Sequence, residues 1–317
     1  MLLAIDGSNL IHRMFHAMPT SLSLGDATPI GAAKGFANKL ISLLHAHAPS
    51  HALVAMDTLA SDGMYHRRRL WADYKMDRAQ KDATMQPQID ICRQITEALG
   101  VLWIDSAGWE ADDVIATAAA AAEGDVLVYS ADSDLLALTM RPGLQVLRAS
   151  RDGESLYGAK DTEELFGCPP SFLPLYTAIE GGHNNVPGVP KLGAKAAQDI
   201  IVAMRDLLSD AEGDFDSGQV WRLTSASCSR VLAEHGVSAK SAQRWAGILA
   251  KHKERLLLSL QLATPDEEVP QVPPFPQLAR RPVQRSEFFA LWRDLAFKMP
   301  SADVLDSLSQ IPLEGIS

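Results

Sequence analysis

The stretch Val126-Leu-Val-Tyr-Ser-Ala-Asp-Ser-Asp134 joins a short apolar run to two acids that follow it directly. A run of this kind, ended by turn residues, is typical of a strand buried in a parallel sheet. Three earlier runs, Met1–Ile5, Ala52–Met56 and Val101–Ile104, have the same form. Because longer segments separate these runs, the sequence predicts an α/β fold with a mostly parallel sheet and helices on both faces.

Apolar residues recur at helical spacing between the strands. Helices are predicted over Gly31–His45, Asp90–Leu99 and Ala111–Glu123, and a fifth strand over Leu144–Leu147. This alternation of strand and helix extends to about residue 160.

The second half of the chain changes to helices separated by Pro and Gly turns. Residues 193–262 have a helical pattern, the proline-rich Pro265–Pro282 is predicted to be an extended connector, and Ser286–Phe297 is predicted to be an amphipathic helix. Since 317 residues exceed what one simple core usually supports, two parts are expected: an α/β domain over 1–160 and a helical domain over 161–317.

The composition is that of a globular, acidic protein. There are 29 Lys and Arg residues against 39 Asp and Glu residues, and 47% of the chain is hydrophobic. The net charge of −10 argues against binding nucleic acid over the whole surface, although a local basic patch is compatible with it. Three scattered cysteines fit neither a disulfide framework nor a zinc site, so a cytoplasmic location is expected. The apolar runs Met1–Ile5 and Val114–Ala122 are too short for a secretory signal or a membrane span.

Acids follow all four of the predicted strands that end before residue 131. Because the carboxyl ends of parallel strands meet at one edge of a sheet, we expect these side chains to gather there. Carboxylates without His or Cys beside them suit Mg²⁺ or Mn²⁺, and such a site supports phosphodiester hydrolysis. The acids are Asp6, Asp57, Glu110, Asp112, Asp113, Asp132 and Asp134.

Each acid also has a purely structural interpretation. Asp6 before Gly7 suits a turn or a helix N-cap, and Asp112 and Asp113 suit the first turn of a helix. Asp132 and Asp134 suit the cap of a helix over Leu135–Met140. Asp57 is the weakest member of the set, because a strand end tolerates an Asp easily.

A basic insertion occupies about residues 58–88, after the second predicted strand. Its cations are Arg67, Arg68, Arg69, Lys75, Arg78 and Lys81, and only two acids lie among them. The interleaved Tyr65, Trp71 and Tyr74 are candidates for stacking on nucleic-acid bases. The alternative is a charged surface helix that contacts only solvent.

A glycine-bearing hairpin at 186–197 is the second candidate for nucleic-acid binding. Backbone N–H groups at the start of the following helix can hold a phosphate without reading sequence. An ordinary joint between two helices is the alternative. The residues expected to contact DNA here are Gly188, Lys191, Gly193, Ala194, Lys195 and Ala196.

These residues together resemble the 5′-nuclease (flap endonuclease) superfamily, which includes the 5′→3′ exonuclease domain of bacterial DNA polymerase I, the phage 5′-nucleases and the exonuclease IX type. The resemblance implies a PIN-like α/β fold, and it implies a stand-alone nuclease because no polymerase domain follows. The motifs that carry it are Ile5–Leu10, Asp73–Arg78, Glu110–Val114, Asp132–Leu136, Pro187–Gly193 and Leu260–Thr264.

The resemblance also implies roles for individual residues. The basic insertion would be a helical arch for a single-stranded 5′ end, with Lys75 and Arg78 as catalytic residues at the scissile phosphate. The hairpin would be a helix–three-turn–helix motif that binds duplex DNA. K⁺ would bind there through the carbonyls of Ala178, Ile179, Pro187, Val189 and Leu192.

One departure concerns the second metal site. The family carries two Asp residues just before the hairpin, where this chain has Gly181 and Asn184, and Glu180 is one position away. We therefore expect one or two catalytic ions. The principal ion would bind Asp6, Glu110, Asp112, Asp132 and Asp134, with Asp57 and Asp113 holding its waters. The double substitution Gly181→Asp and Asn184→Asp is expected to raise cleavage at low Mg²⁺.

The leading interpretation is a monomeric hydrolase that cuts DNA where a single-stranded 5′ end or flap meets a duplex. One alternative is a DNA-binding protein of the same fold with weak or no cleavage. A second is a PIN-type ribonuclease, although the hairpin and the long helical half argue against it. Whether or not the chain cleaves DNA, its affinity for DNA should fall steeply as the salt concentration rises.

Overall fold

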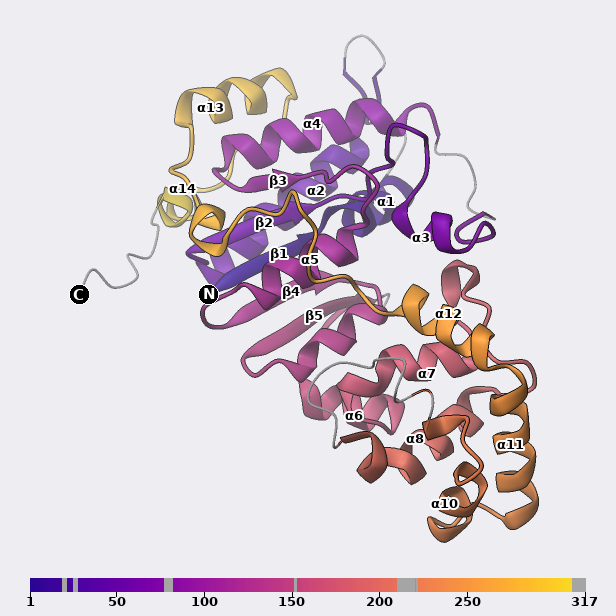
Figure 1. Ribbon diagram of the computed structural model, residues 1–317. Coiled ribbons are helices and arrows are strands. Elements are labelled where there is room, and N and C mark those ends of the chain that lie inside the picture. The colour runs from indigo at the N-terminus through magenta and orange to yellow at the C-terminus, as the bar shows by residue number, and fades with distance from the viewer. Residues whose placement is uncertain are drawn as a thin grey trace.

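The computed structural model describes residues 1–18, 22–24, 28–76, 82–150, 153–209, 220 and 222–309. Its centre is a six-stranded sheet in the order β3-β2-β1-β4-β5-β6 (Figure 1). All neighbours run parallel except β5 and β6, which are antiparallel. The strands are β1 (Leu2–Asp6), β2 (His51–Ala55), β3 (Leu102–Ile104), β4 (Val126–Ser130), β5 (Leu144–Ser150) and β6 (Gly153–Tyr157). The predicted α/β class and mostly parallel sheet are confirmed.

Helices cover both faces of the sheet because the strands are apolar on both sides. In β1, Leu2 and Ala4 belong to one core cluster, whereas Leu3 and Ile5 belong to the other. The first cluster packs against α5 (Ala111–Ala120) and continues into the helical half of the chain. The second packs against α1 (Gly7–Ala17), α2 (Gly31–His47) and α4 (Met85–Ala98).

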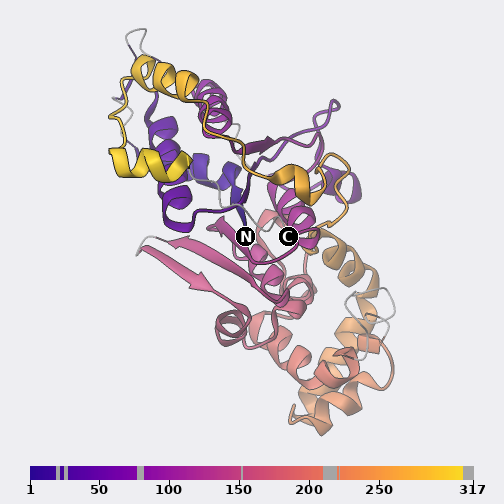
Figure 2. The same ribbon diagram turned by 90° about the vertical axis from the view of Figure 1, so that its left-hand side faces the viewer.

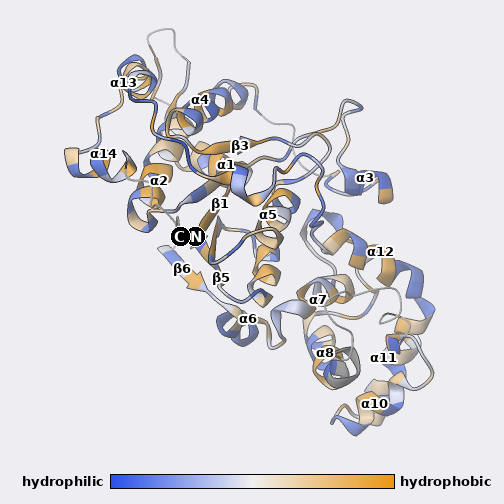
Figure 3. Ribbon diagram, turned by 60° about the vertical axis from the view of Figure 1, so that its left-hand side comes forward, coloured by the Kyte–Doolittle hydropathy of each residue, from blue (hydrophilic) through white to orange (hydrophobic). Residues whose placement is uncertain are grey.

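The helical half extends away from the sheet on the side of α5 (Figures 1 and 2). Within it, α12 (Lys253–Ala263) packs along α7 (Leu173–Glu180) and reaches α3 (His66–Leu70) in the basic insertion. Figure 3 shows α3 as a mostly hydrophilic helix, in keeping with its three arginines. The helical half also contains α6 (Ala159–Phe166), α8 (Ala194–Ser209), α10 (Cys228–Glu234) and α11 (Ala239–Lys251).

The end of the chain returns to the α/β layer. Helices α13 (Arg285–Asp294) and α14 (Ala302–Ser309) pack against α4 and α2, and Phe288 and Trp292 are buried there with ring centroids 4.1 Å apart. The predicted boundary at residue 160 assigns these helices to the C-terminal part, whereas they pack against helices of the N-terminal part.

The proline-rich connector is also more ordered than expected. It contains the 3₁₀ turn η4 (Phe275–Leu278), whose Phe275 is buried and stacks on His51 at 4.1 Å. This segment therefore packs against the amino-terminal end of β2, where His51 also pairs with Ala279.

Several boundaries differ from the predicted ones. The predicted helix over Leu135–Met140 is a 3₁₀ helix, η1 (Asp134–Met140), and α4 begins at Met85 instead of Asp90. The antiparallel β6 was not predicted, because only its last residue is partly buried and it lacks an apolar run. No helix in the described ranges is long and apolar enough to cross a membrane.

Candidate functional site

Four of the seven candidate acids face one cavity of about 500 Å³ at the carboxyl edge of the sheet. Asp6 ends β1, Asp57 follows β2, Asp112 lies in the first turn of α5, and Asp132 follows β4. Residues more than a hundred positions apart therefore meet at the edge where parallel strands end. Asp134 begins η1 beside this group, and its N–H donates to Asp132 Oδ1 at 3.0 Å.

Hydrogen bonds hold the acids in place. Asp6 caps α1, because its Oδ1 accepts from the N–H of Asn9 at 2.9 Å, and its Oδ2 accepts from Ser130 Oγ at 2.7 Å. Asp57 Oδ1 accepts from the N–H of Ala111 at 2.9 Å, at the start of α5. The capping interpretation of Asp6 is therefore correct, and it is compatible with a role in the cavity.

The buried carboxylates repel one another. Burial is the main cause that raises the pKa of Asp6 to about 7, and the negative charge of Asp57 adds to it. Burial also raises the pKa of Asp112 well above its usual value, with further contributions from Asp132 and Asp6. The positive charge of Lys75, at the cavity wall, lowers the pKa of Asp112 and so offsets part of this increase. Such a cluster favours a bound cation, which would relieve the repulsion.

The donor set fits a hard divalent cation, because the cavity offers carboxylate oxygens together with the side chains of Ser8 and Asn9. Within the described ranges, no three acidic, His or Cys side chains are already grouped closely enough to enclose an ion. The carboxylates therefore converge on the cavity without forming a closed coordination shell, and the metal role of all seven acids stays a prediction.

Glu110 and Asp113 lie on a buried ion-pair network instead of the cavity. Arg67 donates from Nη1 to Glu110 at 2.7 Å, and from Nη2 to Asp113 at 2.6 Å. Glu110 also accepts from Lys75 Nζ and from Tyr74 Oη, the latter at 3.0 Å. Two of the predicted metal ligands are thus paired with cations of the basic insertion.

The same network joins the insertion to the end of α12. Arg67 Nη2 donates to the carbonyl of Thr264 at 2.9 Å, and the N–H of Asp266 donates to Asp113 Oδ1 at 2.9 Å. This contact gives the Leu260–Thr264 motif a structural role, because the chain leaving α12 closes over the base of α5.

Two of the residues predicted to contact DNA in the insertion are buried. Arg67 is 7% exposed and Tyr74 is 4% exposed, so this arrangement disfavours their DNA contacts, which stay predictions. Arg68 lines the acidic cavity, and the exposed Arg69 pairs with Asp62 at 2.8 Å. The predicted residues Arg78 and Lys81 lie outside the described residues.

Lys75 occupies a special position in this region. Its backbone has a φ of +53°, and its N–H donates to the carbonyl of Asn184 at 3.0 Å. The side-chain amide of Asn185 donates to the carbonyl of Asp73 at 2.9 Å. The loop before the hairpin therefore rests on the insertion that carries Lys75, a contact that the sequence did not reveal.

The position of Gly181 argues against the double substitution expected to restore a second site. Gly181 has a φ of +89°, which a side chain adopts only with strain, and an added Cβ would lie 3.4 Å from the carbonyl oxygen of Val186. The positive φ is the cost that an Asp would meet there, because the 3.4 Å contact itself is an ordinary van der Waals distance. The gain in cleavage stays a prediction that this backbone conformation disfavours.

The hairpin lies between α7 and α8. Gly193, Ala194, Lys191 and Lys195 are exposed, whereas Ala196 is 9% exposed and belongs to the core. Lys195 pairs with Asp199 at 2.7 Å, within α8. The exposed start of α8 is therefore the part of the hairpin that is open to a phosphate.

Three of the five carbonyls expected to hold K⁺ already accept hydrogen bonds. Ile179 accepts from the N–H of Val189 at 2.8 Å, and Val189 accepts from the N–H of Leu192 at 3.2 Å. Pro187 accepts from Arg255 Nη2 at 2.8 Å. Because a carbonyl oxygen has two lone pairs, these hydrogen bonds leave room for a cation, and the K⁺ site stays a prediction.

Sequence reasoning missed some residues of the cavity. Ser8 and Asn9 line it, as does His12 one turn further along α1. Asn9 Oδ1 also accepts from the N–H of Ala131 at 3.2 Å, which ties α1 to the loop after β4. Ser8 and Asn9 could have been identified from the sequence, because both closely follow Asp6 in the Ile5–Leu10 motif.

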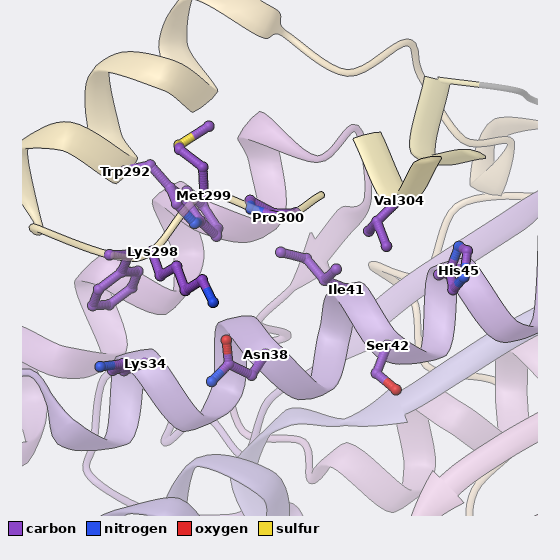
Figure 4. A pocket seen from close by; sticks show the side chains of 11 residues that line it. Lys34, Asn38, Ile41, Ser42, His45, Trp292, Lys298, Met299, Pro300 and Val304 are labelled. Carbon is purple, nitrogen blue, oxygen red and sulfur yellow. The ribbon is translucent and has the colours of Figure 1, made fainter. Parts of the chain in front are cut away.

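A second cavity of about 530 Å³ lies between α2 and the chain segment that joins α13 to α14 (Figure 4). Its wall contains Lys34, His45 and Lys298 beside the apolar Trp292 and Val304. None of the described residues that line it is a carboxylate, so its side-chain oxygens are the neutral ones of Asn38 and Ser42. It shares no lining residue with the acidic site.

Comparisons with known proteins show the family of the chain. Residues 1–167 match the family described as "5'-3' exonuclease, N-terminal resolvase-like domain". The chain is 35% identical over 217 residues to DNA polymerase I of Rhizobium leguminosarum, covering 65% of this chain and 21% of the polymerase. It is 32% identical over 201 residues to a 5'-3' exonuclease of Aquifex aeolicus, covering 62% of this chain and 67% of that protein.

Among solved structures, the fold matches a flap endonuclease of bacteriophage T5, determined as a pseudo-enzyme–product complex with DNA and metal ions. The TM-score is 0.57 at 16% identity, and the match covers 93% of this chain and 99% of the phage protein. At this identity the likeness concerns the fold, a six-stranded, mostly parallel sheet with many helices.

Proposed function

Since the chain belongs to the 5'-3' exonuclease family, we propose that it is a metal-dependent 5′ nuclease that hydrolyses DNA phosphodiesters. The observation that carries this proposal is the convergence of Asp6, Asp57, Asp112 and Asp132 on one cavity at the sheet edge. Because the chain spans about a fifth of the Rhizobium polymerase, the activity is proposed for this chain and not transferred from the whole enzyme.

The four carboxylates would hold Mg²⁺ or Mn²⁺, as one or two ions. A divalent cation supplies stabilisation of charge on the phosphate and lowers the pKa of an attacking water. Asp6 is fixed by Asn9 and Ser130, so its carboxylate is oriented before any ion arrives. Lys75, whose Nζ lies 3.9 Å from Asp57, places a positive charge at the cavity wall, where the scissile phosphate would lie.

The substrate would be DNA with a single-stranded 5′ end or flap. In this proposal the fold is PIN-like, the insertion at 58–88 acts as a helical arch, and the hairpin at 186–197 acts as a helix–three-turn–helix motif. The exposed N–H groups at the start of α8 would hold a phosphate of the duplex. The structural relative from phage T5, which was solved with DNA and metal ions, supports this class of ligand. The monomeric state and the cytoplasmic location stay predictions.

A second candidate is a DNA-binding protein with weak cleavage. It is favoured by the loop at Gly181 and Asn184, where the backbone conformation is adapted to residues without carboxylates. Both candidates bind the same DNA and differ only in turnover.

A labelled 5′-flap DNA with Mg²⁺ or Mn²⁺ separates the candidates. We expect the wild-type chain to cut it and the double variant Asp112→Asn/Asp132→Asn to bind without cutting. Glu164→Gln, at an exposed acid on α6, is the matched control and should cut normally. Binding without cutting by the wild type would favour the second candidate. Preferential cutting of RNA would overturn both.

A further inference from the structure

The groove between α2 and the segment that joins α13 to α14, here called the α2 groove, combines an apolar floor with a basic edge (Figure 4). Ile41, Trp292 and Phe297 form the floor, and all three are buried. Lys34 and Lys298 lie at the edge, and Figure 4 shows the Lys298 ammonium pointing toward α2. None of the described lining residues is acidic, so the groove is locally positive on a chain whose net charge is −10.

The fold does not neutralise the two lysines. Among the described residues, neither Lys34 nor Lys298 has an acidic partner within ion-pair distance. Lys39 of the same helix, in contrast, pairs with Glu154 at 2.7 Å. Two such ammonium groups beside an apolar floor attract a ligand that carries negative charge next to an apolar part.

The opposite end of the groove is electrically balanced. His45 Nδ1 lies 2.7 Å from Ser307 Oγ, where α14 packs against α2. A hydrogen bond from Ser301 is the main cause that lowers the pKa of Asp303, and the charge of His45 is a smaller cause. Asp303 thus places a carboxylate near His45, and the surplus of positive charge belongs to the end that carries the lysines.

The aromatic rings of the floor are packed against one another. Trp292 is 2% exposed, and Phe288 stacks on it with ring centroids 4.1 Å apart. Phe297 meets Trp292 edge-on at 5.7 Å, because the turn after α13 brings its N–H to the carbonyl of Trp292 at 2.9 Å. A nucleobase binds by stacking on an open ring face, so this floor suits an aliphatic side chain better than a base.

The length of the groove suits a short extended peptide. Lys34, Ile41 and His45 line it along one side of α2, and the first and last are about three helical turns, or roughly 16 Å, apart. An extended chain rises about 3.3 Å per residue, so about five residues would span this distance. The volume of about 530 Å³ lies in the range of ordinary ligand sites.

We propose that the α2 groove is a docking site for an extended acidic peptide segment of a partner protein. Carboxylates of the peptide would pair with Lys34 and Lys298, and an aliphatic side chain would contact Ile41 and Phe297. The inference goes beyond the proposed function and does not depend on it. Because the two cavities share no described lining residue, a docked peptide would leave the acidic cavity open to DNA.

The probes for the test are fluorescein-labelled peptides with two Glu residues followed by two Leu residues, separated by no, one or two Gly residues. Fluorescence anisotropy measures their affinity for the full chain at low ionic strength. We expect at least one peptide to bind saturably, and more weakly as salt screens the charges. The double reversal Lys34→Glu/Lys298→Glu should lower its affinity by about tenfold or more. Lys160→Glu/Lys240→Glu, at exposed lysines of α6 and α11, is the matched control and should bind like the wild type.

Replacing both Leu residues of the peptide by Ser tests the apolar floor and should also lower the affinity by about tenfold or more. Circular dichroism checks the fold of each variant. If the double reversal does not fold, the single variant Lys298→Glu, at an exposed position, makes the same comparison.

Three results would overturn the inference. The first is no saturable binding by any of the peptides, and the second is equal affinity of the wild type and the Lys34→Glu/Lys298→Glu variant. The third is a short oligothymidylate that binds more tightly than the peptides and loses this affinity in the same variant, since the groove would then bind nucleic acid. A chain that binds the peptide but does not cut flap DNA would refute the proposed function and leave this inference standing.

Discussion

Replacing Asp6 by Asn isolates the electrostatic cost of the acidic cavity. The two side chains have the same shape, and an Asn oxygen can still accept from the N–H of Asn9, where the present distance is 2.9 Å. The amide nitrogen would face Ser130 Oγ, which now lies 2.7 Å from the carboxylate. The cap of α1 should therefore survive, and the main change is the loss of one buried negative charge.

The size of the effect follows from the pKa of Asp6, which burial and Asp57 raise from 3.8 to about 7. Because the folded state then binds the proton more tightly than the unfolded state, the carboxyl destabilises the ion-free fold as the pH rises from about 4 to 7. A shift of about 3 pKa units corresponds to about 4 kcal/mol above pH 7. Without divalent ions, Asp6→Asn should be more stable than the wild type by up to that amount.

Urea unfolding in the presence of a chelator, at a series of pH values from 4 to 8, measures this difference. The gain should be largest at pH 8 and should shrink towards pH 4, where the wild-type carboxyl is protonated in both states. Asp90→Asn, at an exposed position on α4, is the matched control for the same chemical change outside the cavity. Adding Mg²⁺ should stabilise the wild type more than the variant. A variant less stable than the wild type at pH 8 would refute the reasoning.

Two further variants test the buried network and the hairpin. Arg67→Met leaves two buried carboxylates without their main cation and should lower the free energy of unfolding in denaturant by about 3–5 kcal/mol. The same substitution at the exposed Arg69 should lower it by at most about 1 kcal/mol. Equal losses of stability in the two variants would contradict the role of the buried network. Gly188→Ala should weaken DNA binding in anisotropy titrations, because its Cβ would meet the Gly181 backbone at 2.5 Å. Gly236→Ala, at a φ of +91° with open space around it, is the control for conformational strain alone and should bind normally.

The acidic cavity at the carboxyl ends of the strands could be predicted because local sequence patterns determine where each strand ends. Buried strands have apolar runs, and an acid directly after such a run must lie at the strand's carboxyl end. This reasoning placed Asp6, Asp57 and Asp132 correctly at the cavity, together with Asp112. It needed only the rule that parallel strands end on the same side, and no knowledge of side-chain partners.

The pairing of charges could not be predicted in the same way. Arg67 and Arg69 are alike in the sequence, yet the first is buried on Asp113 and the second is exposed on Asp62. Which of the two arginines is buried depends on the direction in which α3 faces α5. Arg67 and Asp113 are 46 positions apart, so no local sequence pattern indicates that they pair. Similarly, the periodicity of the last amphipathic helix predicted α13 but not the surface on which Trp292 is buried.

The charges of the site divide into two groups with different partners. Arg67 and Lys75 neutralise Glu110 and Asp113 inside the protein, so these acids stabilise the fold without an external ion. The four acids that face the cavity have Lys75 and Arg68 on the described part of its wall, and burial keeps their repulsion strong. The protein thus supplies its own cations where it joins the insertion to α5 and α12, and leaves a deficit of positive charge among the described residues of the cavity. Under the proposed function, that deficit favours divalent cations where a DNA phosphate would be held.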